Sequence, residues 1–190
     1  MKVILFDIGG VICEDIEKHM MKSISEEYKI DYSLVMEVRG KWWDLYACNK
    51  ISEEEYWKGF LKDVGIEDDY SKFVNLPYKK YIKLKESMLP LLEKLSKKYK
   101  LFIVSDHSIN WWNFANEKFK ISQYFEEEFF SFNYKSLKSE GKLFEEILKK
   151  VKKEDCLFID NSRENLKVAE KFGIEGVYFE NVEELRELFS

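Results

Sequence analysis

Short apolar runs and longer amphipathic segments alternate along most of the chain, and this alternation predicts its fold. Apolar runs bounded by turn residues are typical of strands buried on both faces of a parallel sheet. They occupy residues 2–6, 101–104, 128–131, 156–159 and 177–179. Helical periodicity predicts helices over residues 89–95, 109–119, 140–151, 165–172 and 182–189. Strands that alternate with helices favour right-handed crossovers, so we expect an α/β fold with a doubly wound, five-stranded parallel sheet.

Residues 14–84 follow a different pattern. They are polar and aromatic with helical periodicity, and no strand signal interrupts them. Helices are predicted over residues 15–28 and 31–48. A third begins after Ser52, where Glu55 completes a capping box, and ends at Gly65. The sequence therefore predicts a small helical domain, residues 14–84, inserted into an α/β core formed by residues 1–13 and 85–190.

Composition narrows the classes of function. Among 190 residues, 36 acidic and 31 basic side chains give a formal charge of −5, and they are mixed along the chain. Without a basic block we expect no nucleic-acid partner, and without an apolar run of about 20 residues no membrane span. Cys13, Cys48 and Cys156 lack metal-binding spacing, and Met1 leads directly into the first strand. These features predict reduced thiols in a cytoplasmic protein without a signal peptide, either a monomer or a homodimer.

Three of the predicted strands end on an oxygen-bearing side chain. Asp7, Ser105 and Asp160 follow the first, second and fourth strands. Doubly wound sheets bind ligands at the carboxyl ends of their strands, where these side chains would converge. Gly9 and Gly10 would let the backbone approach a ligand closely. The alternative is chance placement, since every strand must end on something polar.

Around these residues lie four short motifs. They are Phe6-Asp7-Ile8-Gly9-Gly10-Val11, Val104-Ser105-Asp106, Lys138 six residues before Phe144, and Phe158-Ile159-Asp160-Asn161 followed by Asn165, Ala169 and Gly173. Each motif alone is weak evidence of a family. Together, in this order and spacing, the four motifs resemble those of the haloacid dehalogenase-like (HAD) superfamily, and the resemblance covers nearly the whole chain. Most members are Mg²⁺-dependent phosphohydrolases that act through an aspartyl-phosphate. The resemblance implies a Rossmann-like core with strand order 3-2-1-4-5 and a helical cap that closes over small substrates.

The resemblance also implies roles for individual residues. Asp7 would be the nucleophile, while Ser105 and Lys138 would hold the transferring phosphoryl group. Asp7, the carbonyl of Gly9, Asp160 and Asn161 would bind Mg²⁺, a hard cation that prefers oxygen ligands. The substrate-binding residues would be Gly9, Gly10, Ser105, Asp106, His107 and Lys138. The cation and Lys138 would offset the repulsion between the Asp7 carboxylate and a phosphate dianion.

The motifs depart from the usual pattern at several positions. Gly9 replaces a second aspartate that protonates the leaving alcohol, help that is typically worth about 10²–10⁴-fold in rate. A branch resembling sugar-1-phosphate phosphatases carries a similar Asp-x-Gly motif. Glu14 or Asp15 could substitute, although both also suit the first turn of a helix. Asn161 removes a charge from an acidic pair, which predicts weaker Mg²⁺ binding. Asp106 stands where asparagine is common, and Lys138, Lys135 or His107 would have to offset its charge.

The first hypothesis is a Mg²⁺-dependent phosphatase for a small phosphorylated metabolite, with a sugar phosphate as the first candidate. The alternatives are a catalytically silent HAD-like binding protein and a metal-independent dehalogenase. Dehalogenases also lack the second aspartate, but their fourth motif differs from Asp160-Asn161-Ser162. The aromatic side chains of the cap suit its own core, although they could also line a substrate pocket. These residues are Trp42, Trp43, Tyr46, Trp57 and Phe60.

Overall fold

A computed structural model describes residues 2–190 and contains one five-stranded, all-parallel sheet with the order β3-β2-β1-β4-β5. The predicted fold class and strand order are therefore confirmed. The strands are β1 (Val3–Phe6), β2 (Lys100–Ser105), β3 (Glu127–Phe130), β4 (Cys156–Asp160) and β5 (Glu175–Tyr178). The central strand, β1, pairs with β2 on one side and β4 on the other. The strands that carry the polar ends are thus neighbours.

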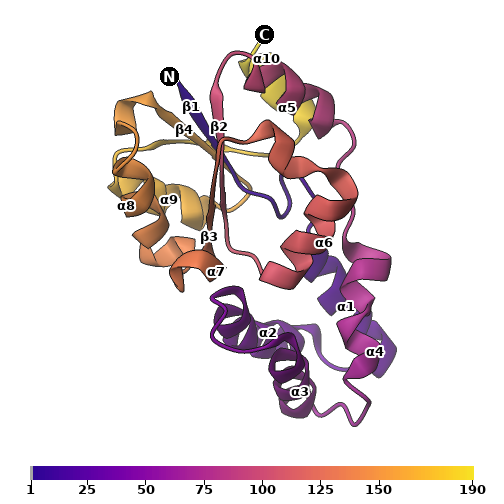
Figure 1. The fold of residues 1–190 in the computed structure, drawn as a ribbon. Coiled ribbons are helices and arrows are strands. Elements are labelled where there is room, and N and C mark those ends of the chain that lie inside the picture. Colours follow the sequence, from indigo (N-terminus) through magenta and orange to yellow (C-terminus); the bar gives the residue numbers. More distant parts are fainter. Residues whose placement is uncertain (1) are drawn as a thin grey trace.

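Helices cover both faces of the sheet (Figure 1). Successive side chains of a strand point to opposite faces, so Ile4 and Phe6 pack with α5 and α10, while Val3 and Leu5 pack with α8 and α9. The helices of the core are α5 (Met88–Ser96), α6 (Ile109–Phe119), α7 (Ser131–Tyr134), α8 (Lys142–Leu148), α9 (Arg163–Lys171) and α10 (Val182–Leu188). Short helical turns are η2 (Ile121–Tyr124), η3 (Lys138–Glu140) and η4 (Lys153–Asp155).

A group of helices follows β1 and lies at the carboxyl end of the sheet, at the bottom of Figure 1. We call it the cap. Its elements are α1 (Ile16–Tyr28), α2 (Tyr32–Ala47), α3 (Glu53–Val64), α4 (Ser71–Val74) and η1 (Pro77–Tyr81). Ser52 and Glu55 form the predicted capping box, and Gly65 ends α3 with a φ of 78°. The cap encloses its own apolar cluster, in which Trp57 and Phe60 are fully buried.

The cap is joined to the core through α6. Trp111 of α6 belongs to the apolar cluster of the cap, where its ring lies 5.1 Å from that of Trp43. The Glu53 carboxylate of α3 accepts hydrogen bonds from Trp111 Nε1 at 3.0 Å and Asn110 Nδ2 at 2.9 Å. A buried carboxylate requires such donors. These contacts hold the cap over the strand ends.

Three local predictions differ from the structure. The third strand begins one residue earlier than predicted, and Ser131 already belongs to α7. The fifth strand, predicted over residues 177–179, spans Glu175–Tyr178. The predicted helix over residues 140–151 is wrong in its first part, because Gly141, with a φ of 83°, separates η3 from α8. A Cβ atom at Gly141 would lie 2.6 Å from the Phe172 ring, so only glycine fits this turn.

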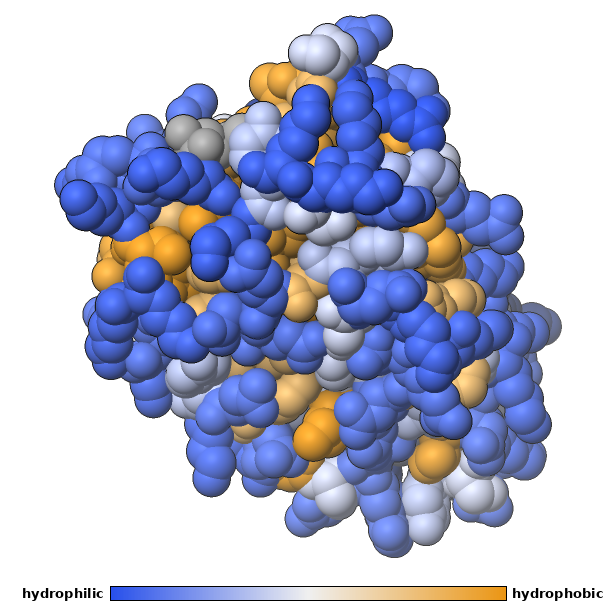
Figure 2. Space-filling view, turned by 45° about the horizontal axis from the view of Figure 1, so that its top comes forward, coloured by the Kyte–Doolittle hydropathy of each residue, from blue (hydrophilic) through white to orange (hydrophobic). Residues whose placement is uncertain are grey.

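Within residues 2–190, no helix combines the length and the hydrophobicity that crossing a bilayer demands. The face shown in Figure 2 is mostly hydrophilic, with apolar side chains visible between charged ones. The three cysteines are free and buried, and burial raises the pKa of the Cys13 thiol to about 12.

Candidate active site

The register of the sheet places the polar strand ends side by side. Phe6 pairs with Ile103 of β2 and with Ile159 of β4. Asp7 follows Phe6 and Asp160 follows Ile159, so these two residues lie side by side at the carboxyl ends of their strands. Ser105, two residues after Ile103, lies one residue further along the strand direction. This is the convergence that the sequence predicts.

The loop after β1 is a tight turn. The Ile8 carbonyl accepts hydrogen bonds from the backbone N–H groups of Ile12 and Cys13. Gly10 has a φ of 79°, and a Cβ there would lie 2.1 Å from the Asn161 side chain. Glycine at this position thus lets Asn161 pack directly on the loop that carries Asp7.

Lys138 lies at the centre of the charged groups. Its Nζ is 2.9 Å from Asp7 Oδ1 and 2.7 Å from Asp160 Oδ2, and the side chain is 2% exposed. Burial alone would lower the pKa of Lys138, but the carboxylates of Asp160, Asp7 and Asp106 outweigh it and raise the pKa. Lys138 is therefore a fixed cation between two carboxylates.

Asp160 is held from its own side of the sheet. Its Oδ1 accepts the Ser162 N–H at 2.7 Å, and its Oδ2 accepts Asn165 Nδ2 at 3.0 Å in addition to Lys138. Burial raises the pKa of Asp160, although Lys138 acts in the opposite direction. These contacts orient the carboxylate toward Asp7.

The second motif supplies a hydroxyl and a carboxyl group. Ser105 Oγ is buried and has no hydrogen-bond partner among the described residues. An unsatisfied buried hydroxyl is costly, which is typical of a group that meets a ligand. Asp106 Oδ1 accepts the Lys138 N–H at 2.9 Å, and burial raises the pKa of Asp106 to about 6.

His107 is a neutral imidazole in this site. Its Nδ1 lies 3.2 Å from the Ser108 carbonyl oxygen, to which it donates a hydrogen bond, so Nε2 carries the lone pair. Burial lowers the pKa of His107 to about 4. His107 therefore offers a hydrogen-bond acceptor, not a positive charge, to the space in front of it.

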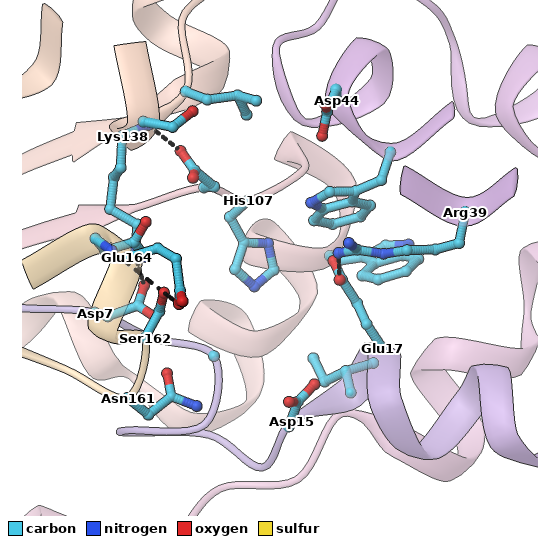
Figure 3. Close-up of a pocket in the computed structure, with 18 residues that line it drawn as sticks. Asp7, Asp15, Glu17, Arg39, Asp44, His107, Lys138, Asn161, Ser162 and Glu164 are labelled. Carbon is cyan, nitrogen blue, oxygen red and sulfur yellow. Dashed lines mark hydrogen bonds and ion pairs between the residues drawn. The ribbon is translucent and has the colours of Figure 1, made fainter. Parts of the chain in front are cut away.

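These groups border a cavity of about 570 Å³ between the strand ends and the cap. Figure 3 shows Asp7 and Lys138 on one side, Arg39 and Glu17 on the other, and His107 between them. Ser105, Gly10 and Asp160 are among the expected site residues but do not line the cavity. Those that line it are Asp7, Gly9, Asp106, His107, Lys138 and Asn161. Of the candidate substitutes for the missing acid, Asp15 lines the cavity, while Glu14 borders a separate hollow beside Lys85.

The wall contributed by the cap was not foreseen from the sequence. Arg39 and Asp44 reach the cavity from α2, and Glu17 reaches it from α1. Arg39 is one of only three arginines in a chain rich in lysine. The planar guanidinium suits stacked and paired contacts better than an ammonium group does. The presence of an arginine at this position could therefore have indicated a functional residue from the sequence. Trp43 packs in the cap, as predicted, and also lines the cavity.

A family model of haloacid dehalogenase-like hydrolases matches residues 1–173. The chain belongs to this family. None of the curated protein sequences compared with this HAD-like chain matches it significantly.

Solved structures share the fold of this HAD-like hydrolase. The HAD family enzyme BT-2542 from Bacteroides thetaiotaomicron superposes with a TM-score of 0.78 at 22% identity, covering 100% of this chain and 98% of that one. The same enzyme has been crystallised with magnesium and inorganic phosphate. A predicted HAD-like hydrolase from Porphyromonas gingivalis gives a TM-score of 0.71 at 18% identity, covering 100% and 98%. L-2-haloacid dehalogenase from Xanthobacter autotrophicus gives 0.70 at 12% identity, covering 100% and 82%.

The donor set of the HAD-like site fits a magnesium ion. Mg²⁺ binds through one or two carboxylates together with other oxygens and water. Asp7 and Asp160 are held together by Lys138, and Asp160 Oδ1 accepts only the Ser162 N–H within residues 2–190. No cluster of three or more acidic, histidine or cysteine side chains suited to a metal occurs in that range. Two carboxylates, supplemented by other oxygens and water, are a ligand set that Mg²⁺ accepts.

Proposed function

We infer that this HAD-like hydrolase is a Mg²⁺-dependent phosphatase that cleaves a small phosphorylated metabolite through an aspartyl-phosphate on Asp7. The observation that carries this proposal is the buried Lys138, whose ammonium group lies within 2.9 Å of Asp7 and 2.7 Å of Asp160. A nucleophilic carboxylate must approach a phosphate dianion, and a fixed cation at that point lowers the repulsion. The magnesium and phosphate bound by BT-2542 support the same chemistry.

Each residue has a defined part in the proposed reaction. Asp7 attacks the phosphorus atom, the P–O bond to the alcohol oxygen of the substrate breaks, and the alcohol leaves. Water then hydrolyses the acyl phosphate on Asp7, which releases inorganic phosphate and restores the carboxylate. Lys138 neutralises charge on the nucleophile and on the phosphoryl oxygens. Ser105 Oγ, which is buried and has no partner within residues 2–190, would donate a hydrogen bond to the phosphoryl group. Asp7, the Gly9 carbonyl, Asp160 and Asn161 would hold Mg²⁺, which would supply Lewis-acid stabilisation of the transferring group when bound.

The proposal accounts for the absence of the second aspartate. Gly9 has no side chain to protonate the leaving alcohol. One group on the cavity wall can protonate the leaving alcohol, namely Asp106, whose pKa burial raises to about 6, whereas the neutral His107 offers only a hydrogen-bond acceptor. A substrate with a good leaving group requires less protonation, so it isolates the step carried out by Asp7.

Hydrolysis of p-nitrophenyl phosphate tests the proposal, because p-nitrophenolate leaves without protonation. Turnover should require Mg²⁺, cease in EDTA and disappear in Asp7→Asn, while the exposed Glu27→Gln on α1 serves as a control that keeps it. Beryllofluoride should bind the wild-type protein with Mg²⁺ and not Asp7→Asn. Equal turnover with and without Mg²⁺, or turnover by Asp7→Asn, would contradict the proposal.

A further inference from the structure

The cap forms one wall of the cavity and carries an ion pair between Arg39 and Glu17. The charges of this wall determine which substrates it favours. Four charged residues reach this wall from the cap, namely Asp15, Glu17, Arg39 and Asp44. Three carboxylates and one guanidinium give it a formal charge of −2. Asp106 and Glu164 add carboxylates on the core side of the same cavity. The part of a substrate that extends beyond the phosphate therefore meets negative charge.

Arg39 cannot serve as a free anion site. Its guanidinium forms an ion pair with Glu17 and lies 5.2 Å from the centre of the Trp43 ring. Both charged side chains are about one-fifth exposed, at 20% and 19%. An anionic ligand that captured Arg39 would leave the carboxylate of Glu17, which is about four-fifths buried, without its partner, which is unfavourable. The pair thus presents donors without a net positive charge (Figure 3).

The same wall suits hydroxyl groups. A hydroxyl both donates and accepts hydrogen bonds. Guanidinium N–H groups of Arg39 can donate to it, and the carboxylates of Glu17 and Asp15 can accept from it. The buried indoles of Trp43 and Trp111 line the cavity between these polar groups and offer apolar contact. A volume of about 570 Å³ is enough for a small phosphate ester.

We propose that the Arg39–Glu17 pair is a charge filter that admits phosphate monoesters with an uncharged, hydroxyl-bearing remainder and rejects those with a second anionic group. This inference rests on the phosphatase function proposed above. It assigns Glu17 and Arg39 a role in specificity, separate from the phosphoryl chemistry of Asp7 and Lys138.

Binding to the Asp7→Asn variant in the presence of Mg²⁺ tests the filter without turnover. Isothermal titration would compare four probes: glucose 6-phosphate, 6-phosphogluconate, glucose 1,6-bisphosphate and glucosamine 6-phosphate. The filter predicts that glucose 6-phosphate binds at least roughly tenfold more tightly than 6-phosphogluconate and the bisphosphate. The negative wall also predicts that the ammonium-bearing glucosamine 6-phosphate binds at least as tightly as glucose 6-phosphate. Equal or tighter binding of either anionic probe, weaker binding of glucosamine 6-phosphate than of glucose 6-phosphate, or no binding of any probe would overturn it.

Two further substitutions in the Asp7→Asn variant should change the affinity for 6-phosphogluconate relative to glucose 6-phosphate in opposite directions. Glu17→Gln frees the guanidinium, so 6-phosphogluconate should gain roughly tenfold relative to glucose 6-phosphate. Arg39→Gln removes the only cation of this wall, so 6-phosphogluconate should lose affinity further. Glu27→Gln, an exposed change on the same helix as Glu17, should leave the ratio unchanged. An unchanged ratio in folded Glu17→Gln would overturn the filter.

These outcomes separate the two proposals. If the wild-type protein hydrolyses p-nitrophenyl phosphate with Mg²⁺ but the probes bind without regard to charge, only the filter fails. If Asp7→Asn retains that hydrolysis, the phosphatase mechanism itself fails, whatever the ratios show.

Discussion

Replacing Asp106 by asparagine should make the metal-free protein more stable at neutral pH. The carboxyl group of Asp106 is enclosed near Asp7 and Asp160, and burial raises its pKa from 3.8 to about 6. Its Oδ1 accepts the Lys138 N–H at 2.9 Å, a contact that an amide oxygen can also make. The substitution therefore removes a charge and keeps the hydrogen bond.

The magnitude follows from the difference in pKa. A raised pKa means that the folded state binds the proton more tightly than the unfolded state, so stability falls as the pH rises from 3.8 to about 6. A difference of roughly two pH units corresponds to about 3 kcal/mol, at 1.36 kcal/mol per unit. Because Asp106 is only partly buried, we expect a gain of about 1 to 3 kcal/mol for Asp106→Asn above pH 7.

Urea unfolding of the metal-free protein at pH 4 and pH 7.5 provides the assay. At pH 4 the folded wild-type protein carries Asp106 protonated, so wild type and variant should differ little. At pH 7.5 the variant should be the more stable by the amount above. The reasoning is refuted if the difference in unfolding free energy between the two proteins is the same at both pH values, or if the variant is the less stable at pH 7.5.

Four further outcomes follow from the site. Asp7→Asn should lower p-nitrophenyl phosphate turnover by about 10⁴-fold or more while circular dichroism stays unchanged; partial activity would exclude it as the nucleophile. Lys138→Met should cost about 3–5 kcal/mol in urea unfolding, because the carboxylates of Asp7 and Asp160 lose their cation; an unchanged midpoint would contradict the ion-pair assignment. Ser105→Ala should raise stability by about 1–3 kcal/mol, since it removes a buried hydroxyl that has no partner within residues 2–190, yet should weaken phosphate binding about tenfold, and equal phosphate affinity would argue against its role. Cys13, with its pKa raised to about 12 by burial, should react with a thiol reagent such as DTNB only on unfolding; rapid labelling of the folded protein would count against that burial.

The fold could be predicted largely because strand signals are local. A strand buried on both faces must be a short apolar run, and each of the five runs in the sequence forms a strand. The polar ends at Asp7, Ser105 and Asp160 follow from the same pattern, because parallel strands present their carboxyl ends at one edge. The break at Gly141 could not be predicted from periodicity alone, because it lies in the left-handed backbone conformation of this glycine, with a φ of 83°.

The residues that line the site from the cap were harder to predict from the sequence, because their roles depend on contacts between different helices. Arg39 and Glu17 are 22 residues apart on different helices, and their pairing depends on how α1 and α2 pack. The cavity-lining role of Trp43 depends on the contact between the cap and α6. Residues of this kind carry no motif, because their function arises only from the tertiary arrangement.

The covalent step on Asp7 is open to one direct measurement. Borohydride added during turnover of p-nitrophenyl phosphate with Mg²⁺ should reduce an acyl phosphate at Asp7 to homoserine, which peptide mass spectrometry would locate. The proposed mechanism predicts homoserine at Asp7 alone, and none without substrate or without Mg²⁺. Steady turnover with unmodified Asp7, or homoserine at another position, would contradict it.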